Sequence, residues 1–327
     1  MKSIFSSLKV FLCTFLFVGF FFNVVQSGEG QIDISTLPVT ISSPGSYILV
    51  KDIVFENIDE NAITINSDNV TIDLGGHTID GDDNTFLQVR GIISGANTEN
   101  ITLKNGRVVN WPRDGIDLSD SVNCHIENVK ASGNGRYGVN TGMSSMVFKC
   151  TATDNDNAGI KAGENSQVTN CVSKSNVAHG IFLVEGLAAK NNCRGNEVNG
   201  IWAAYNSVIK DNVCSNNKMS GIGGYGAFII NNHCKGNLYG INPKRYSKVI
   251  SNTCDDNTSK TDNGAGIHVE GSGNVIRGNH VTRNNTGIRS DSTVNYFADN
   301  TASGNDTDYS IASGNVEGSG DLANISF

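Results

Sequence analysis

Short segments in which hydrophobic and polar residues alternate recur along the chain. Val70, Ile72 and Leu74 alternate with polar residues, and Ile101 and Leu103 do the same farther along the chain. Alternation over four to six residues is typical of a half-buried β-strand. The segments carry neither the apolar spacing of an amphipathic helix nor the dipeptides of tight hairpins. The pattern therefore predicts many short strands that are not joined as a meander.

Regular spacing of glycine and asparagine gives these segments a period of about 21 residues, which is the range of solenoid repeats. A glycine followed by a β-branched residue recurs once in each repeat, at Gly91, Gly115, Gly138, Gly159, Gly180, Gly200, Gly221, Gly240, Gly266 and Gly287. One asparagine column comprises Asn134, Asn155, Asn176, Asn196, Asn217, Asn237, Asn257, Asn284 and Asn305. A second column, five positions earlier in each repeat, comprises Asn191, Asn212, Asn232, Asn252, Asn279 and Asn300. The two columns and the glycines together indicate a solenoid.

The period defines the fold class and the domain organisation. About 21 residues accommodate three short strands and three turns, and successive coils stack at about 4.8 Å. We expect an all-β fold, a right-handed parallel β-helix of ten or eleven coils over residues 67–313, about 50 Å long. Residues 28–66 are expected to cap the first coil, because an open sheet edge invites pairing with other chains. Residues 314–327 lose the pattern and are expected to form a C-terminal cap or tail.

The asparagine columns need no ligand to explain them. Asparagine tolerates the left-handed backbone conformation of tight turns. Stacked in register, each amide can also donate to the amide of the next coil, which makes an asparagine ladder. We therefore interpret both columns as structural.

Residues 1–27 have the pattern of an export signal. Lys2 and Lys9 precede an apolar run from Val10 to Phe22, and Val25 and Ser27 occupy the small-residue positions of a cleavage site before Gly28. A run of this length is short for a membrane span, and no later stretch approaches the ~18 residues that a span requires. An uncleaved anchor helix is the alternative. We expect a secreted, periplasmic or cell-surface protein without a membrane span after cleavage.

Charge narrows the choice of partner. The chain has a net charge of −8, and removal of Lys2 and Lys9 leaves 22 basic against 32 acidic residues, a net charge of −10. An acidic chain without an evident basic stripe is a poor candidate for nucleic-acid binding. The sequence gives no indication of the oligomeric state.

Seven cysteines remain after the signal, an odd number. Cys193, Cys214, Cys234 and Cys254 each lie three positions before a repeat asparagine, at a place where other coils have Ala, Ser or Val. We interpret this position as a small interior one, filled by buried free thiols. Disulfides between neighbouring coils are the alternative, because the coil spacing falls within the permitted Cα distance.

One row of side chains is expected to point outward and to meet a ligand. In the strand after each glycine the β-branched residue points inward and the next residue outward. The outward row is Asp117, Asn140, Lys161, Phe182, Trp202, Gly223, Asn242, His268 and Arg289, followed two positions later by Tyr225, Lys244, Glu270 and Asp291. Aromatic faces stack on sugar rings, while amides and charges hydrogen-bond hydroxyl and carboxylate groups. This row predicts a polysaccharide ligand, with a mixed solvated face as the alternative.

The repeat resembles the right-handed β-helix repeat superfamily, whose pectin-lyase-like folds include pectate lyases, mannuronan C5-epimerases and periplasmic copper-site maturation proteins. The likeness rests on the Gly-Ile-x-Leu and Asn-x-x-x-x-Asn patterns and on the lead-in from Asn69 to Ile79, and it covers about residues 35–312. It implies the fold strongly and the function weakly. The lead-in includes His77, which we interpret as structural.

A local segment is similar to the epimerase motif Tyr-Gly-Phe-Asp-Pro-His-Glu. The chain has Tyr239, Gly240 and Pro243 at matching positions but Asn242, Lys244 and Arg245 in place of the acid, the histidine and the glutamate. The resemblance implies a uronan lyase or epimerase, and the substitutions mean that other residues would have to act.

Proton abstraction beside a uronate carboxylate needs a base, together with a cation or amide for the enolate charge. We expect His268 as the base, with Lys244, Asn242 and Arg289 around the carboxylate. The longer repeat at residues 259–263 is expected to form a loop beside this site. The predicted substrate-binding residues are Asp117, Lys161, Phe182, Trp202, Tyr225, Tyr239 and Arg245. Arg113, Asp114 and Asp117 form a second candidate cluster.

The sequence supports no cofactor or metal. Calcium-dependent lyases need clustered acids, but Asp154, Asp156, Asp255 and Asp256 fall on turns of distant coils, and no His/Met cluster suggests copper delivery. Three hypotheses remain: a protein that binds and modifies an acidic polysaccharide, a non-catalytic adhesion solenoid, and a periplasmic metallocentre accessory protein.

Overall fold

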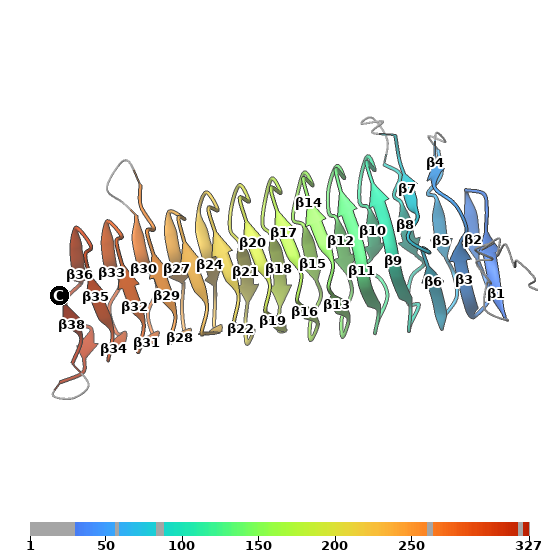
Figure 1. Ribbon diagram of the computed structural model, residues 1–327. Coiled ribbons are helices and arrows are strands. Elements are labelled where there is room, and N and C mark those ends of the chain that lie inside the picture. Colours follow the sequence, from blue (N-terminus) through green and yellow to red (C-terminus); the bar gives the residue numbers. More distant parts are fainter. Residues whose placement is uncertain (1–29, 56–58, 83–87, 260–263, 320–322, 327) are drawn as a thin grey trace, which may run out of the picture.

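The protein is a parallel β-helix whose coils stack along one axis (Figure 1). The computed structural model describes residues 30–55, 59–82, 88–259, 264–319 and 323–326. The expected signal segment and its cleavage site lie outside these residues, as does most of the loop expected at residues 259–263. The described part of the chain contains no helix long and apolar enough to cross a membrane.

One face of the solenoid is a parallel sheet of 13 strands that carries the predicted outward row. In order, its strands are β2 (Val39–Ile41), β5 (Ile63–Ile65), β8 (Ile92–Ser94), β10 (Ile116–Leu118), β12 (Val139–Thr141), β15 (Ile160–Ala162), β18 (Ile181–Val184), β21 (Ile201–Ala204), β24 (Ser220–Gly224), β27 (Tyr239–Pro243), β30 (Ala265–Val269), β33 (Thr286–Ser290) and β36 (Thr307–Ile311).

A second sheet of 25 strands forms two further rows of parallel pairs. The first row is β1 (Gln31–Ile34), β3 (Gly45–Leu49), β6 (Val70–Asp73), β9 (Thr102–Val109), β11 (His125–Ser132), β13 (Met146–Phe148), β16 (Gln167–Thr169), β19 (Leu187–Ala189), β22 (Val208–Lys210), β25 (Phe228–Ile230), β28 (Lys248–Ile250), β31 (Val275–Arg277), β34 (Tyr296–Ala298) and β37 (Val316–Glu317). The second row is β4 (Ile53–Val54), β7 (Thr78–Asp80), β14 (Thr151–Thr153), β17 (Val172–Lys174), β20 (Asn192–Arg194), β23 (Val213–Ser215), β26 (His233–Lys235), β29 (Thr253–Asp255), β32 (His280–Thr282), β35 (Thr301–Ser303) and β38 (Ile325–Ser326). The long strands β9 and β11 belong to both rows.

The solenoid has about 13 coils, more than the ten or eleven expected. The additional coils contain β2, β5 and β36, which pair in register with the strands beside them. They lack the glycine marker, because Pro38, Ala62 and Asp308 stand before their first inward-facing residues. Residues 28–66 thus contribute strands from β1 onward, and their role as a cap stays a prediction.

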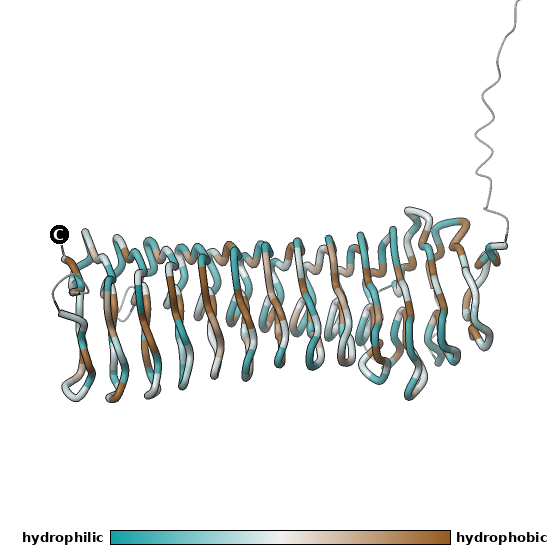
Figure 2. Tube along the Cα trace, turned by 90° about the horizontal axis from the view of Figure 1, so that it is seen from below, coloured by the Kyte–Doolittle hydropathy of each residue, from teal (hydrophilic) through white to brown (hydrophobic). Residues whose placement is uncertain are grey.

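The inward-facing side chains of the strands fill the interior of the solenoid. Hydrophobic positions recur at matching places in successive coils, with hydrophilic ones between them (Figure 2). In the 13-stranded sheet the residue after each marker glycine is completely buried, as in Ile116, Ile201 and Ile288. The glycine itself is required by the neighbouring coil, since a Cβ on Gly200 would lie 2.6 Å from the carbonyl oxygen of Gly221.

Both asparagine columns form ladders inside the coil, as predicted. Asn217 illustrates the pattern: its Oδ1 accepts from the backbone N–H of Asn196 at 3.1 Å and from the Asn196 side chain at 2.9 Å, while its Nδ2 donates to Asn237. The left-handed residue is the one before, such as Asn216 with φ of 53°. The expectation that the ladder residues themselves adopt this conformation was wrong, because the inward amide and the left-handed turn occupy adjacent positions.

The seven described cysteines are buried and free. Cys193, Cys214, Cys234 and Cys254 are paired in register in consecutive strands and are completely buried, next to Ser173 and Val281 in the same column. The position is therefore a small interior one, as expected.

Candidate functional site

The outward row lies on consecutive strands of the 13-stranded sheet. The register pairs Asp117, Asn140, Lys161, Phe182, Trp202, Gly223 and Asn242 along one line, and pairs His268 with Arg289 beyond it. The predicted residues nevertheless do not form one cluster. Seven strand spacings, about 34 Å, separate the strand of Asp117 from that of His268.

The centre of the row is an aromatic strip, which we define as His179, Phe182, Trp202, Tyr205 and Tyr225. The His179 ring stacks on Trp202 with centroids 6.0 Å apart and lies at the same distance from Phe182. Trp202 meets Tyr225 edge-on at 5.9 Å, and Tyr225 stacks on Tyr205 at 6.4 Å. The strip thus offers aromatic surface along three consecutive strands.

The aromatic strip ends at a pocket of about 520 Å³, which we call the tyrosine pocket. Its lining residues are Tyr205, Tyr225, Gly226, Lys244, Arg245, Tyr246, Glu270 and Gly271. Tyr205 and Tyr246 are 61% and 75% exposed, which leaves their ring faces available to a ligand. Arg245 has no acidic partner among the described residues. The pocket therefore combines stacking surfaces with an unpaired cation, which suits a sugar that bears a carboxylate.

The predicted catalytic residues meet beside this pocket. His268, whose side chain is 6% exposed, places Nε2 at 2.8 Å from Asp291 Oδ2 and Nδ1 at 3.4 Å from Glu270 Oε1. The Nδ1 contact lacks hydrogen-bond geometry. Asn242 donates through Nδ2 to the carbonyl oxygen of His268 at 2.8 Å, and the ring of Tyr239 lies 4.5 Å from the imidazole. Asn242 and His268 are thus held together.

Both cations expected to neutralise a substrate carboxylate have acidic partners in the protein. Lys244 forms an ion pair with Glu270, and Arg289 Nε lies 2.8 Å from Asp291 Oδ1. Burial raises the pKa of Glu270, but the hydrogen bond and charge of Lys244 outweigh it and the net pKa is lowered. Asp291 follows the same pattern: burial raises its pKa, but Arg289 and His268 lower it more. Both carboxylates are therefore ionised at neutral pH and balance the two cations.

Tyr239 differs from these ionised groups. Burial and, next, the negative charge of Glu270 raise the pKa of the phenol. The phenol therefore holds its proton at neutral pH and can act as a proton donor.

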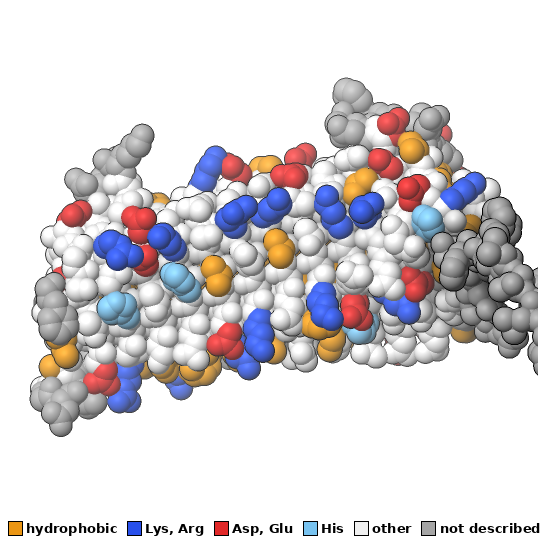
Figure 3. Space-filling model, viewed as in Figure 1, with side chains coloured by type: hydrophobic (Ala, Val, Ile, Leu, Met, Phe, Trp, Pro, Cys, Tyr) orange, Lys and Arg blue, Asp and Glu red, His pale blue; other side chains and the backbone are white. Residues whose placement is uncertain are grey.

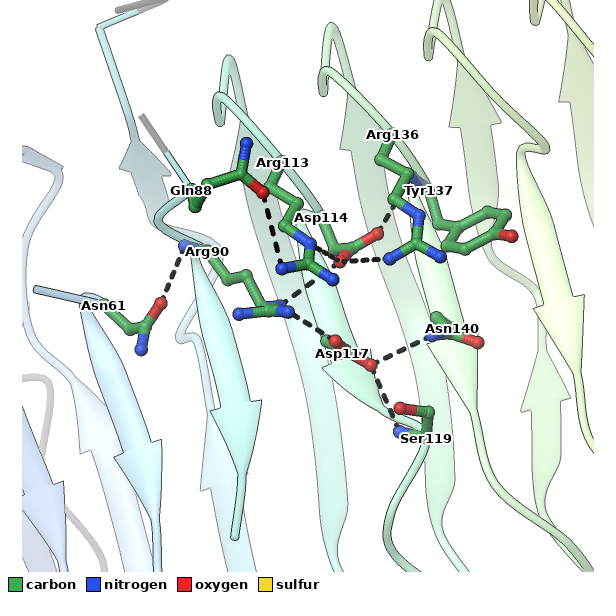
Figure 4. A network of polar contacts seen from close by, with 10 residues as sticks. All are labelled: Asn61, Gln88, Arg90, Arg113, Asp114, Asp117, Ser119, Arg136, Tyr137 and Asn140. Atoms are coloured by element: carbon green, nitrogen blue, oxygen red, sulfur yellow. Dashed lines mark hydrogen bonds and ion pairs between the residues drawn. The ribbon is translucent and has the colours of Figure 1, made fainter. Parts of the chain in front are cut away.

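A second polar cluster lies near the other end of the same sheet (Figure 4). The Asp114 carboxylate is completely buried, and its Oδ2 lies 3.2 Å from Arg90 Nε, 3.4 Å from Arg113 Nε and 3.8 Å from Arg136. Arg90 Nε also lies 2.8 Å from Asp117 Oδ2. Burial and the charge of Asp117 raise the pKa of Asp114, against the Tyr137 N–H and the charges of Arg136 and Arg90.

Two neighbours extend this cluster along the row. Asn140 donates to Asp117 Oδ1 at 2.9 Å, and the ring of Tyr137 lies under both Arg136, at 4.6 Å, and Lys161, at 5.2 Å. The structure thus places Lys161 with this cluster, away from His268.

A match to a family model, in agreement with the fold, identifies the family. The family model described as a right-handed β-helix region matches residues 39–205, about half of the chain. The protein belongs to the right-handed β-helix family. A second family model, described as a periplasmic copper-binding protein (NosD), matches residues 189–319 of this β-helix protein. No curated protein matches the sequence.

Solved structures extend the likeness in fold. The Azotobacter vinelandii mannuronan C-5 epimerase AlgE4 A-module is 16% identical, with a TM-score of 0.64 over 89% of this chain and 88% of that one. The periplasmic alginate epimerase AlgG is 13% identical, with a TM-score of 0.60 over 84% and 77%. A tailspike of E. coli bacteriophage HK620 is 13% identical, with a TM-score of 0.62 over 83% of this β-helix and 60% of the tailspike. At these identities the likeness shows the fold alone.

Several residues of these sites were not assigned a role from the sequence. Tyr205 and Tyr246 stand in turns, where the strand period gives no direction, and Arg90, Arg136 and Tyr137 precede the marker glycines. The repeat could have identified the last three, since they occupy equivalent positions one or two places before Gly91 and Gly138. The described residues contain no group of three or more side chains arranged to bind a metal ion.

Proposed function

We propose that this β-helix protein binds an acidic polysaccharide along the outer face of its 13-stranded sheet and modifies a uronate residue beside the tyrosine pocket. The observation that carries the proposal is the continuity of the aromatic strip with a pocket that contains Lys244 and Arg245 and adjoins His268. Sugar rings stack on aromatic faces, and the guanidinium of Arg245 matches a carboxylate. A chain of sugars laid along the strip therefore presents one carboxylate at the pocket.

The proposed modification is of the lyase or epimerase type. His268 is the base that takes the proton from C5 of the uronate, and the electron pair of the broken C5–H bond moves onto the carboxylate. Tyr239 is the acid that supplies the proton returned to C5 or to the leaving oxygen. Lys244, Asn242 and Arg289 stand around this site, where a cation or an amide stabilises the developing charge. Return of a proton to C5 from the opposite face gives the epimer. Cleavage of the bond between C4 and the bridging oxygen, which takes up a proton, gives an unsaturated end.

The location that fits this activity is outside the cytoplasm. The export signal expected at residues 1–27, the periplasmic epimerase among the structural neighbours and the NosD family model support a secreted, periplasmic or cell-surface protein. Detection of the processed chain, beginning at Gly28, in a secreted or periplasmic fraction tests this part of the proposal.

Binding and modification are tested together with polymannuronate, polygalacturonate and a neutral glucan. We expect the two uronans to be retarded by the protein in affinity electrophoresis, and Trp202→Ala to weaken this binding at least tenfold. Asn192→Ala, an exposed residue on the other sheet, is the matched control and should bind as the wild type does. Failure of both uronans to bind would overturn the proposal.

Modification is followed by the absorbance of unsaturated ends and by the epimer ratio in NMR spectra. Tyr239→Phe and His268→Gln should abolish product while the uronan still binds. A wild-type protein that binds a uronan but changes none of its residues would show that the modification is wrong and that the non-catalytic solenoid is the better description.

A further inference from the structure

In the polar cluster of Figure 4, the described positively charged side chains outnumber the carboxylates that they pair with. Arg90, Arg113 and Arg136 surround two carboxylates, and Lys161 lies above the same Tyr137 ring as Arg136. With both acids ionised, the described residues of this cluster include four cations and two anions. The cluster beside His268 is balanced by contrast, because Lys244 and Arg289 each pair with one acid.

Hydrogen-bond donors are also in excess in this cluster. Three guanidiniums carry about fifteen N–H donors, whereas two carboxylates accept about eight hydrogen bonds. Part of that capacity is already used, since the backbone N–H of Tyr137 donates to Asp114, and Asn140 and the backbone N–H of Ser119 donate to Asp117. Guanidinium donors therefore remain for an acceptor from outside.

The arrangement keeps these donors at the surface. The side chain of Asp114 is 0% exposed and that of Asp117 is 9% exposed, and both carboxylates accept hydrogen bonds from within the protein. The side chains of Arg90, Arg113 and Arg136 are 16%, 29% and 37% exposed. Asp114 thus acts as a buried anchor that fixes three guanidiniums side by side, and their exposed edges form a rigid cationic patch.

We propose that Arg90, Arg113 and Arg136 form a carboxylate-binding subsite for a uronate residue of the same polysaccharide, remote from the residue that is modified. The inference rests on the proposed function, and it adds the residues that make the protein prefer a long polysaccharide chain to a short one. Because the subsite stands seven strands from His268, about 34 Å away, only a long chain reaches both. Binding at two linked sites raises the affinity for such a chain well above that for a short one.

The test compares polymannuronate with its tetramer, which is far shorter than this span. The variant is Arg90→Gln with Arg136→Gln, and the control is Lys174→Gln with Arg194→Gln, which removes the same charge from β17 and β20 on the other sheet. Measured by titration calorimetry, the first variant should bind the polymer about tenfold more weakly and the tetramer unchanged. The control should bind both ligands as the wild type does.

A second variant guards against loss of structure in the double variant. Arg136→Gln alone changes the most exposed of the three side chains, and it should weaken polymer binding about threefold while the urea midpoint stays constant. Polymer affinity that is unchanged in both variants would overturn the subsite. If Trp202→Ala nevertheless weakens binding at least tenfold, the proposed function survives without the subsite. A wild-type protein that binds no uronan would overturn both proposals.

Discussion

The inside and the outside of this β-helix differ in whether a position keeps the same residue from coil to coil. Inside, Asn217 and its equivalents repeat in every coil from Asn134 to Asn305 and bond to each other. Outside, on the 13-stranded sheet, the equivalent position changes from Asp117 to Trp202 to His268 along the row. Identical asparagines in successive coils can hydrogen-bond to one another, which stabilises the stack. The residues of the outer row differ from coil to coil, so they do not form such a ladder.

The difference teaches where function can be sought in a solenoid. A buried amide that bonds to an identical amide above and below leaves no group for a ligand. The outward clusters at Asp114 and His268 interrupt the repeat, and each concentrates several charges on neighbouring strands. Figure 3 shows charges of both signs along another face of the molecule, where hydrophobic side chains appear mostly singly.

The largest effect expected of a single substitution comes from the interior ladder. Asn217→Ala leaves the backbone N–H of Asn196 buried without its acceptor, and the Asn196 side-chain amide keeps only the carbonyl oxygen of Ser173. We expect the free energy of unfolding to fall by about 2–5 kcal/mol, measured by urea denaturation. Asn192→Ala, at an exposed position of β20, should cost less than about 0.5 kcal/mol. Equal costs at the two positions would break the distinction between inside and outside.

The next largest effect is a pH dependence within the aromatic strip. Burial lowers the pKa of His179 to about 4, from the 6.5 of a free imidazole. The unfolded chain therefore takes up a proton from about pH 6.5 downward while the folded protein resists it, so this contribution to stability is present above pH 6.5 and is lost as the pH falls towards 4. Between pH 7.5 and 5 the loss should be about 2 kcal/mol.

Urea midpoints of the wild type and His179→Gln over this range test the assignment. Carboxylates stay largely ionised above pH 5, so they add little to the change. We expect the variant to lose most of the pH dependence. A variant that keeps it would place the titrating group elsewhere.

A smaller effect is expected at the cysteine column. Cys214→Ala places at a buried position a residue that other coils already have there, namely Ala131, Ala152 and Ala302. The cost in free energy of unfolding should be about 1 kcal/mol, because one sulfur atom leaves a small cavity.

In the wild type we expect no cysteine of the folded protein to react with a thiol reagent and all seven to react in denaturant without reductant. Fewer than seven would indicate disulfides between coils.

The smallest effect on stability, with a clear effect on binding, is expected for Gly223→Ala. The new Cβ would lie 2.8 Å from Cε3 and Cζ3 of Trp202, so the indole ring must move off the sheet. We expect uronan affinity to fall about fivefold, which corresponds to about 1 kcal/mol, while the urea midpoint changes little. Ser310→Ala, farther along the row, is the control and should leave affinity unchanged. Unchanged affinity in Gly223→Ala would remove Trp202 from the binding surface.

Much of the fold could be predicted from the sequence. The repeat period, the inward column of Cys193 to Cys254 and the ladder of Asn191 to Asn300 follow from spacing alone, because each coil repeats the same local geometry. The number of coils could not, since Ala62 and Asp308 replace the glycine that marks a coil. Pairing in register then depends on the neighbouring coil and leaves no local signal.

The candidate sites were predictable only in part. The row from Asp117 to Arg289 follows from the alternation of a strand, but spacing does not say which members touch. The ion pairs of Lys244 and Arg289 with acids on their own face depend on side-chain directions that the period leaves open.

The sequence by itself therefore determined the coil, because inward and outward positions in a stacked strand alternate with a fixed period. It also determined which residues line the outer face. Only the tertiary structure decided that Asp114 is a buried anchor for three guanidiniums, and that Tyr205 and Tyr246 close a pocket beside Lys244. These outcomes depend on turns and long side chains from several coils, whose positions are set by contacts across the stack and not by the repeat within one coil.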